Sequence, residues 1–537
     1  MLLDRFLDDS AARVPQKVAL VCRGVRHTYA QLDARANAVA QAMRSRGVAR
    51  GDRVVAFLGN SAEMVVAMFA ALRLGAVFVP VNPLTRRDKL AYILNDTRAS
   101  AMVCEGSLER EWAGALAANA SVRSCFVASG GLSIDPRCLA FPRDAGAPRP
   151  ESAAIDQDLA ALIYTSGSTG DPKGVMLTHV NMVSAAESVG TYLGLREDDV
   201  IGCALPLAFD YGLYQVLMAF RVGATVVLED SFAFPLKVMQ VFTGERMTVF
   251  PGVPTMFAVL MGLRALEGLD FSSLRLITNT AAALPEDHIA RLRARFPKAT
   301  LYSMYGLTEC KRVTYLPPEQ LDIRPTSVGR GMPNEEVWLV DDSGRRLPNG
   351  STGELVIRGS HVMRGYWEKP RETAERLRPG PIPGEMVLYS GDIFRTDEEG
   401  WLYFVARKDD IIKSRGEKVS PREVENAICS LPGVRMAAVV GVADAVLGQA
   451  IKAFVVPEEG RALGEREVIR HCLGRLESFM APKYVEFVDR LPVTDTGKVK
   501  RAALAAKPAV PSKGGNKSAG DRIDGARIPS RQLLHGR

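Results

Sequence analysis

The N-terminal half of the chain alternates between segments of helical periodicity and short runs of apolar, often β-branched residues. Residues 31–48 repeat apolar positions at helical spacing, and 60–74 do so again. Between and after them, Arg53 to Phe57 and Ala76 to Pro80 read as strands. The strand–helix–strand order recurs between Asp199 and Leu228. This rhythm predicts an α/β fold, in which helices pack on the faces of layered β-sheets.

The pattern changes from about Gly353, where short strands alternate with Gly- and Pro-rich turns. A second compact unit follows, with helices expected at 421–431 and 466–477. Its expected strands are 436–442, 452–456 and 483–487. We therefore predict a large N-terminal domain, a small mobile α+β domain and a disordered basic tail, with boundaries at 1–408, 409–506 and 507–537.

Composition narrows the class of protein. The 537 residues are 47% hydrophobic and 24% charged, as in a globular protein, and the net charge is +7. The tail carries +5 of that charge, which argues against a nucleic-acid-binding face on the folded part. No two of the eight cysteines form a CxxC pair, so we expect reduced, mostly buried thiols in a cytoplasmic protein. The apolar stretch from Met64 to Val81 is broken by Arg73 and Gly75, so no membrane span is expected.

A Gly- and hydroxyl-rich loop follows the strand-like run Ala161 to Tyr164. It reads Thr165-Ser-Gly-Ser-Thr-Gly-Asp-Pro-Lys-Gly174. Glycines let backbone N–H groups approach anionic oxygens, and Lys173 adds a point charge, although a surface loop of this composition is also common. Lys173 is followed by Gly and not by Ser or Thr, which excludes a Walker A motif. The string resembles the signature of the adenylate-forming (AMP-binding) superfamily, which includes acyl-CoA synthetases, amino-acid adenylation domains and luciferases.

Four later segments match the same superfamily in the expected order. They are Met304-Tyr-Gly-Leu-Thr-Glu309, Tyr389-Ser-Gly-Asp392, Arg407-Lys-Asp-Asp-Ile-Ile-Lys-Ser-Arg-Gly-Glu-Lys-Val-Ser-Pro421 and Pro492-Val-Thr-Asp-Thr-Gly-Lys498. The resemblance covers roughly residues 10–506 and implies that the enzyme binds ATP and Mg²⁺. The ATP-binding residues that it implies are Thr165, Ser166, Gly167, Ser168, Thr169, Gly170, Lys173, Tyr305, Asp392 and Arg407.

The resemblance also implies the catalytic roles. Thr308 would contact phosphate, Glu309 would hold Mg²⁺, and Lys498 would bridge the substrate carboxylate and the α-phosphate. Asp409 stands at the hinge between the domains, and Gly416 lies on the path of the thiol acceptor. Here Ala406 replaces the usual Gly before Arg407, and Arg415 replaces the first of two usual glycines. Each of these motif residues taken alone would more often be structural or solvated, so the ordered set carries the interpretation.

The implied function is that of an AMP-forming carboxylic acid–thiol ligase. A carboxylate and ATP would give acyl-AMP and pyrophosphate, and a thiol would then give the thioester and AMP. The acceptor is coenzyme A or the phosphopantetheine of a carrier protein acting in trans. One alternative is a stand-alone amino-acid or acyl adenylation enzyme that loads a carrier protein, and another is a nucleotide-binding protein without catalysis.

The resemblance places the acid pocket on three segments. The lining residues would be Phe209, Asp210, Tyr211, Val253, Pro254, Asn279, Thr280 and Ala281. Acyl-CoA synthetases typically have His at the position of Phe209, whereas amino-acid adenylation domains typically have Phe-Asp, whose Asp pairs with the substrate amine. Asp210 could therefore pair with an amino group or cap the following helix, and the sequence leaves both open. The Thr280-Ala-Ala triplet adds bulk where the family often has Gly-Gly-Ala, which argues against very long acyl chains.

Overall fold

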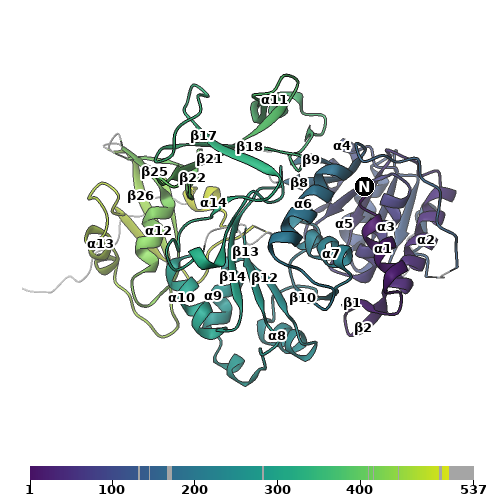
Figure 1. The fold of residues 1–537 in the computed structure, drawn as a ribbon, viewed down its shortest axis with the longest axis horizontal. Coiled ribbons are helices and arrows are strands. Elements are labelled where there is room, and N and C mark those ends of the chain that lie inside the picture. The colour runs from purple at the N-terminus through teal and green to yellow at the C-terminus, as the bar shows by residue number, and fades with distance from the viewer. Residues whose placement is uncertain are drawn as a thin grey trace, which may run out of the picture.

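The computed structural model describes most of the chain, and its secondary structure is mixed α/β (Figure 1). The described residues are 1–130, 134–143, 146–165, 172–280, 284–408, 410–414, 417–444, 447–494 and 499–506. Two large sheets and one smaller sheet make up the N-terminal part, and a fourth sheet belongs to the small C-terminal domain. The predicted fold class, a large layered α/β domain followed by a small α+β domain, is confirmed.

The first sheet has nine strands among the described residues, in the order β16-β15-β14-β13-β12-β10-β11-β1-β2. Strands β14, β13, β12, β10, β11 and β1 run parallel, so their carboxyl ends meet at one edge. The strand bounds are β1 Val18–Cys22, β2 Val25–Thr28, β10 Val200–Cys203, β11 Thr225–Leu228, β12 Val249–Gly252, β13 Leu276–Asn279, β14 Thr300–Tyr305, β15 Thr314–Leu316 and β16 Arg330–Gly331.

The second sheet has the order β19-β9-β8-β4-β3-β5-β6-β7 in the described part of the chain. Its bounds are β3 Arg53–Phe57, β4 Val77–Val81, β5 Ala101–Cys104, β6 Ser124–Val127, β7 Cys138–Ala140, β8 Leu159–Thr165, β9 Lys173–Thr178 and β19 Gly365–Tyr366. Residues from both large sheets and the helices between them form one buried hydrophobic cluster, so the two sheets share a core. A second cluster fills the far side of this sheet.

The third sheet is antiparallel, with order β17-β18-β21-β20 and with β22 beside β21. Its bounds are β17 Glu335–Val340, β18 Thr352–Gly359, β20 Leu377–Pro379, β21 Met386–Thr396 and β22 Leu402–Arg407. The fourth sheet, with order β24-β23-β26-β25 and β27 beside β26, has two hydrophobic clusters of its own. Its bounds are β23 Ile412–Ser414, β24 Glu417–Val419, β25 Val434–Asp444, β26 Gly448–Pro457 and β27 Tyr484–Phe487.

The helices cover the faces of these sheets, and several begin at the caps that the sequence supplies. Thr28 and Thr178 each form a capping box with the residue three positions on, and Ser61 accepts a hydrogen bond from the Met64 amide. The bounds are α1 Arg5–Arg13, α2 Tyr29–Ser45, α3 Ala62–Arg73, α4 Arg87–Asp96, α5 Glu109–Ala117, α6 His179–Tyr192, α7 Asp210–Val222, α8 Pro235–Gly244, α9 Pro254–Gly262, α10 Glu286–Arg295, α11 Pro370–Arg376, α12 Pro421–Cys429, α13 Glu465–Leu473 and α14 Arg501–Ala505.

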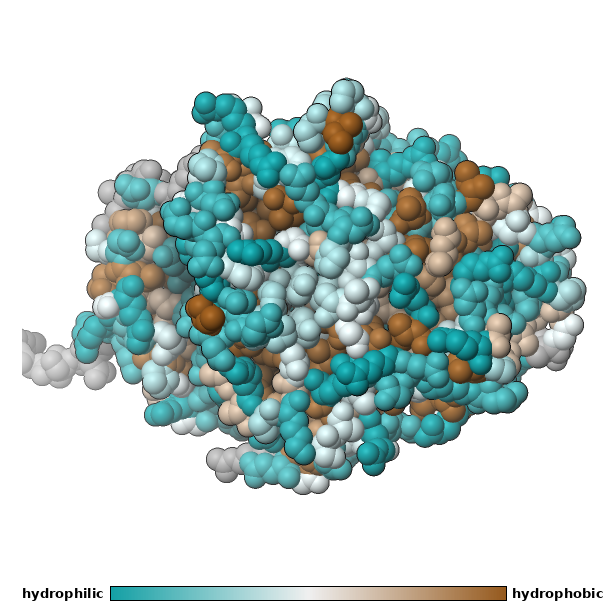
Figure 2. Space-filling view, in the orientation of Figure 1, coloured by the Kyte–Doolittle hydropathy of each residue, from teal (hydrophilic) through white to brown (hydrophobic). Residues whose placement is uncertain are grey.

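The surface and the thiols agree with the composition. The face shown in Figure 2 is mostly hydrophilic, with hydrophobic residues in small separate areas. In the described ranges, no helix combines the length and the apolar character needed to cross a bilayer. All eight cysteines are free, and seven of them are buried, as the sequence predicted. Cys429 is the partly exposed exception.

Candidate functional site

The residues predicted for the acid pocket converge at the carboxyl edge of the first sheet. Phe209 and Asp210 open α7, which follows β10, and Val253 follows β12. Asn279 ends β13, whose register pairs Gly252 with Asn279 and Asn279 with Ser303. The predicted nucleotide motif then leaves the end of β14. Because these strands are parallel neighbours, segments far apart in sequence meet at the switch between strand and helix where α/β sheets bind ligands.

Tyr211 ties two of these segments together. Its hydroxyl lies 2.9 Å from both the carbonyl oxygen and the Oγ1 atom of Thr278. Burial raises the pKa of the Tyr211 hydroxyl to about 12, so it stays protonated. Tyr211, Val253, Asn279 and Thr280 are all buried, which gives this edge a closely packed floor. Ala281 lies outside the described residues.

Asp210 has a partner that the sequence reasoning did not name. Phe209 occupies the N-cap position of α7 and makes no side-chain cap hydrogen bond, while Asp210 is the first helical residue. The Nζ atom of Lys311 lies 3.6 Å from Oδ2 of Asp210 and donates a 2.8 Å hydrogen bond to its carbonyl oxygen. The carboxylate is therefore paired within the protein. The sequence had suggested two other roles for it, pairing with a substrate amine or capping α7.

The motif Tyr389–Asp392 forms a bulge in β21. Its neighbour β18 pairs Glu354 with Ile393 and Val356 with Tyr389, so three residues stand opposite one. Gly391 has φ +70°, and a Cβ atom there would overlap the guanidinium of Arg376. A bulge of this kind re-aims the side chain beside it. This segment, in which Asp392 is a predicted ATP-binding residue, is thus a glycine-dependent kink that positions the Asp392 side chain.

Three of the predicted nucleotide-binding side chains are in direct contact. Oδ2 of Asp392 accepts a hydrogen bond of 2.6 Å from the Tyr305 hydroxyl, and Oδ1 accepts one of 3.2 Å from Nε of Arg407. Asp392 and Arg407 lie opposite each other on β21 and β22, which accounts for the second contact. Asp392 is 4% exposed, whereas the Arg407 side chain is about half exposed at 52%. The result is a fixed acceptor with an accessible cation beside it.

The two ends of the predicted phosphate loop pair with each other. Thr165 ends β8, Lys173 begins β9, and the two are register partners in an antiparallel hairpin. The loop residues Ser166, Gly167, Ser168, Thr169 and Gly170 lie outside the described residues. The structure thus brings Lys173 to the base of the loop, where its ammonium lies 5.5 Å from the ring centroid of Tyr366.

Tyr366 connects this loop to Glu309, and the sequence reasoning missed it. The Tyr366 hydroxyl donates a 2.7 Å hydrogen bond to Oε1 of Glu309, while Tyr366 itself pairs with Val175 of β9. The Met363 amide also donates to the Glu309 carbonyl oxygen at 2.7 Å. Thr308 and Glu309 are partly buried. Residues 363–366 therefore form a strap from the first sheet to the second; its only sequence signal is the Gly-Tyr-Trp run at 365–367.

The C-terminal domain contacts the N-terminal part through β22. Ser420 donates a hydrogen bond of 2.5 Å to the carbonyl oxygen of Val405, and Arg422 donates one of 3.3 Å to that of Phe404. The predicted catalytic Lys498, the hinge Asp409 and Gly416 lie outside the described residues. Their placement relative to the strand edge stays a prediction.

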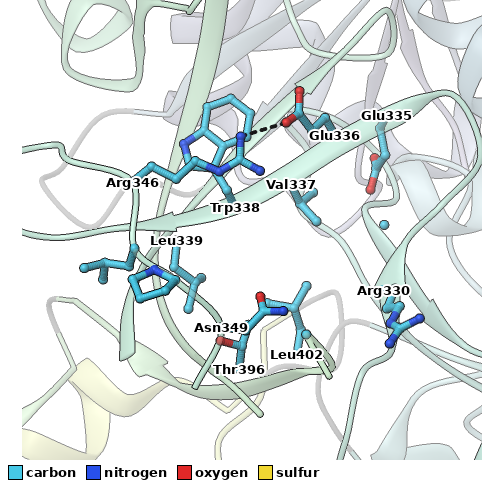
Figure 3. Close-up of a pocket in the computed structure, with 14 residues that line it drawn as sticks. Arg330, Glu335, Glu336, Val337, Trp338, Leu339, Arg346, Asn349, Thr396 and Leu402 are labelled. Atoms are coloured by element: carbon cyan, nitrogen blue, oxygen red, sulfur yellow. Dashed lines mark hydrogen bonds and ion pairs between the residues drawn. The ribbon is translucent and has the colours of Figure 1, made fainter. Parts of the chain in front are cut away.

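A cavity of about 590 Å³ opens beside the third sheet, away from this cluster (Figure 3). Trp338, Asn349 and Leu402 line it, and Arg346 forms a 2.9 Å ion pair with Glu336 at its rim. Its described lining includes none of the predicted site residues. The contacts among the predicted residues, rather than this hollow, define the candidate site at the strand edge.

Comparison with known proteins identifies the same family as the sequence motifs. The AMP-binding enzyme family matches residues 7–367, and the AMP-binding enzyme C-terminal domain matches residues 423–498. A feruloyl-CoA synthase from Amycolatopsis sp is 35% identical over 495 residues, which cover 91% of this chain and 96% of that protein. Tyrocidine synthase 3 from Brevibacillus parabrevis is 30% identical over 511 residues, 94% of this chain but 8% of that protein.

A solved structure agrees along nearly the whole length. The crystal structure of the anthranilate CoA ligase AuaEII in complex with anthranoyl-AMP superposes with a TM-score of 0.86 at 28% identity, covering 94% of this chain and 96% of that one. The chain therefore belongs to the AMP-binding enzyme family and is an adenylate-forming enzyme of the acyl-CoA synthetase type.

Proposed function

We propose that this enzyme activates a small carboxylic acid with MgATP and transfers the acyl group to the thiol of coenzyme A. The observation that carries the proposal is the contact of Tyr305, Asp392 and Arg407 next to the strand ends that hold the acid-pocket residues. A nucleotide bound at the first group has its phosphates directed toward Glu309 and Lys173, and an acid bound at the second group meets them there.

The described side chains fit a bound nucleotide. The Asp392 carboxylate, held in place by Tyr305 and Arg407, is an acceptor of the kind that ribose hydroxyls donate to. Tyr305 packs edge-on against Phe394 at 4.8 Å, which holds its ring as a platform for adenine. Thr165, Thr308 and Lys173, together with the loop residues 166–170, would surround the phosphates.

Glu309 fits a magnesium ion. Its Oε1 atom accepts from Tyr366, and no described residue donates to its other oxygen, Oε2. A carboxylate oxygen is the ligand that Mg²⁺ prefers, and the ion would draw charge from the phosphate oxygens when bound. Tyr366 fixes the orientation of the carboxylate by its hydrogen bond.

The chemistry needs no protein nucleophile. A carboxylate oxygen of the acid attacks the α-phosphorus, a new P–O bond forms, and the bond to the pyrophosphate leaving group breaks. The thiol then gives up its proton to solvent and attacks the acyl carbon, the C–S bond of the thioester forms, and the bond from the acyl carbon to the phosphate oxygen breaks as AMP leaves with the electron pair. Lys498 would stabilise the charge of the first step, and we assign residues 1–408 to the ATP- and acid-binding domain and 409–506 to the mobile domain that carries it. Asp409 would be the hinge, and Gly416 would line the thiol path.

The pairing of Asp210 with Lys311 supports an acid without an α-amino group. A carboxylate that faced the pocket alone would require a cation from the substrate. Here Lys311 supplies that cation from 3.6 Å away. This favours a CoA ligase over an amino-acid adenylation enzyme, in line with the feruloyl-CoA and anthranilate enzymes, which act on aromatic acids.

A second candidate acceptor is the phosphopantetheine of a carrier protein acting in trans. The similarity to a part of tyrocidine synthase 3 supports it. ATP–pyrophosphate exchange over a panel of simple and amino acids identifies the acid, and mass spectrometry of the product with coenzyme A or carrier protein identifies the acceptor. Exchange with amino acids alone, or thioester on carrier protein alone, would overturn the coenzyme A assignment.

The role of Lys498 has its own test. We expect Lys498→Ala to abolish adenylate formation and to spare thioester formation from supplied acyl-AMP. Lys500→Ala, at an exposed lysine two positions on, is the matched control and should change neither half-reaction. Equal loss of both half-reactions in Lys498→Ala would refute the assignment.

A further inference from the structure

Two consecutive cations lie buried just after the magnesium motif. Lys311 is 3% exposed and Arg312 is 1% exposed, in the turn between β14 and β15. Fully buried Lys and Arg side chains are rare unless they are paired. The two therefore need partners, and the partners differ.

Lys311 is satisfied within the chain. Its Nζ atom contacts Asp210, as described above, and lies 4.1 Å above the ring of Tyr214. The Asp210 carboxylate supplies one negative charge, whereas Lys311 and Arg312 together carry two positive charges.

Arg312 has no such partner in the part of the chain that the structure describes. Its guanidinium lies over the ring of Tyr211, 5.0 Å from the centroid, and its Nε and Nη1 atoms are buried without a hydrogen-bond acceptor. A guanidinium keeps its charge at any physiological pH. Leaving such donors unsatisfied costs about 1–3 kcal/mol or more, so an acceptor from outside the described chain would be strongly favoured.

The place of Arg312 indicates where that acceptor comes from. Tyr211, whose ring it covers, is itself bonded through its hydroxyl to Thr278 of β13. The guanidinium thus lies against Tyr211, a residue predicted for the acid pocket, whose hydroxyl reaches the end of β13.

We propose that Arg312 binds a second carboxylate of the acid substrate, so that the enzyme activates one end of a dicarboxylic acid. The inference rests on the proposed function, because it assigns the far end of the same acid pocket. Arg312 acts here as a specificity-determining residue, and Asp210 leaves it available by pairing with Lys311.

The test compares each dicarboxylic acid with its monoamide, which has nearly the same shape and lacks one charge. Terephthalic, isophthalic, glutaric and adipic acids provide aromatic and aliphatic skeletons, and ATP–pyrophosphate exchange gives kcat/KM for each. On at least one skeleton, we expect the wild-type enzyme to prefer the diacid by about 30-fold or more, the loss typical of a buried charge pair that is deprived of one partner.

Substitution then locates the preference. Arg312→Gln should lower kcat/KM for the diacid by about 30-fold or more and leave that for the monoamide within a few-fold, whereas Arg312→Lys should retain part of the preference. An equal loss for both substrates would mean that Arg312 acts on the reacting carboxylate or on the fold, and would overturn the proposal.

The wild-type comparison decides even when a variant does not fold. Monoamides or simple monocarboxylic acids that react as well as the diacids would overturn the inference and leave the proposed function standing. Absence of exchange with every acid of all series would overturn the proposed function and this inference with it.

Discussion

Replacing Asp392 by Asn tests the cluster on which the nucleotide site rests. The amide has nearly the shape of the carboxylate but carries no charge, and it presents one acceptor oxygen instead of two. The carboxylate accepts from the Tyr305 hydroxyl at 2.6 Å and from Nε of Arg407 at 3.2 Å. The variant can keep one of these two bonds at most. Its NH₂ group then faces either Nε of Arg407, which can only donate, or the Tyr305 hydroxyl, which would have to turn to accept.

The magnitude follows from the loss of at least one hydrogen bond to a charged group. Such bonds contribute about 1.5–3 kcal/mol each, so the lost interaction corresponds to about 10- to 150-fold in affinity. Because the same carboxylate orients Tyr305 and would accept the ribose hydroxyls, the loss should appear in the KM for ATP. The KM for the acid should change little, since the acid-pocket residues lie on other strand ends.

Pyrophosphate exchange at varied ATP provides the measurement, and Asp397→Asn provides the matched control. Asp397 follows the end of β21 and accepts from the Tyr403 hydroxyl at 3.1 Å and from Nε of Arg324 at 3.5 Å. Both variants lose a carboxylate bonded to a Tyr and an Arg, so both should lose thermal stability. An unchanged KM for ATP in Asp392→Asn, or an equal rise in both variants, would refute the assignment.

Three further variants test other parts of the site. Tyr366→Phe removes the hydroxyl that donates the 2.7 Å hydrogen bond to Glu309 and keeps the ring, so kcat/KM for exchange should fall about 10- to 150-fold. Excess Mg²⁺ should restore part of the lost kcat/KM. Full activity at low Mg²⁺ would contradict the role of the strap. Gly391→Ala forces a side chain onto a φ of +70° and should lower the free energy of unfolding by about 1 kcal/mol or more in chemical denaturation; a neutral result would mean that the bulge tolerates a Cβ. Burial lowers the pKa of Lys311 from 10.5 to about 7, so between these values the unfolded chain holds a proton that the folded chain releases, and the wild type gains stability as the pH rises. The stability of Lys311→Met relative to the wild type should therefore be higher at about pH 6 than at about pH 9, and a constant difference in denaturation midpoints would contradict the lowered pKa of Lys311.

The local pattern of apolar and capping residues was enough to predict several helices and strands. The run Arg53–Phe57 is β3 at the predicted bounds, and the helix expected from Asn60 is α3, which begins at Ala62 after the Ser61 cap. The helix expected from 421 begins at Pro421, as predicted. In these segments apolar periodicity and capping chemistry point to the same structure.

Contacts between segments that are far apart in the chain could not be predicted from the sequence. The pairing of Asp210 with Lys311 joins residues on different strand ends, and only the order of parallel strands brings them together. The motif residues Asp392 and Arg407 were predicted from resemblance, but their meeting depends on a bulge and a cross-strand register. Tyr366 was missed because a lone Tyr in an apolar run reads as core, and its role depends on the strap that carries it to Glu309.

The central claim is that the acid is activated by direct attack on the α-phosphorus of ATP. The most direct test uses an acid that the enzyme converts, labelled with ¹⁸O in both carboxylate oxygens, with ATP and coenzyme A. Mass spectrometry should find one ¹⁸O in AMP for each thioester formed and none in pyrophosphate. Thioester formation with unlabelled AMP, or with the label in orthophosphate, would contradict the account.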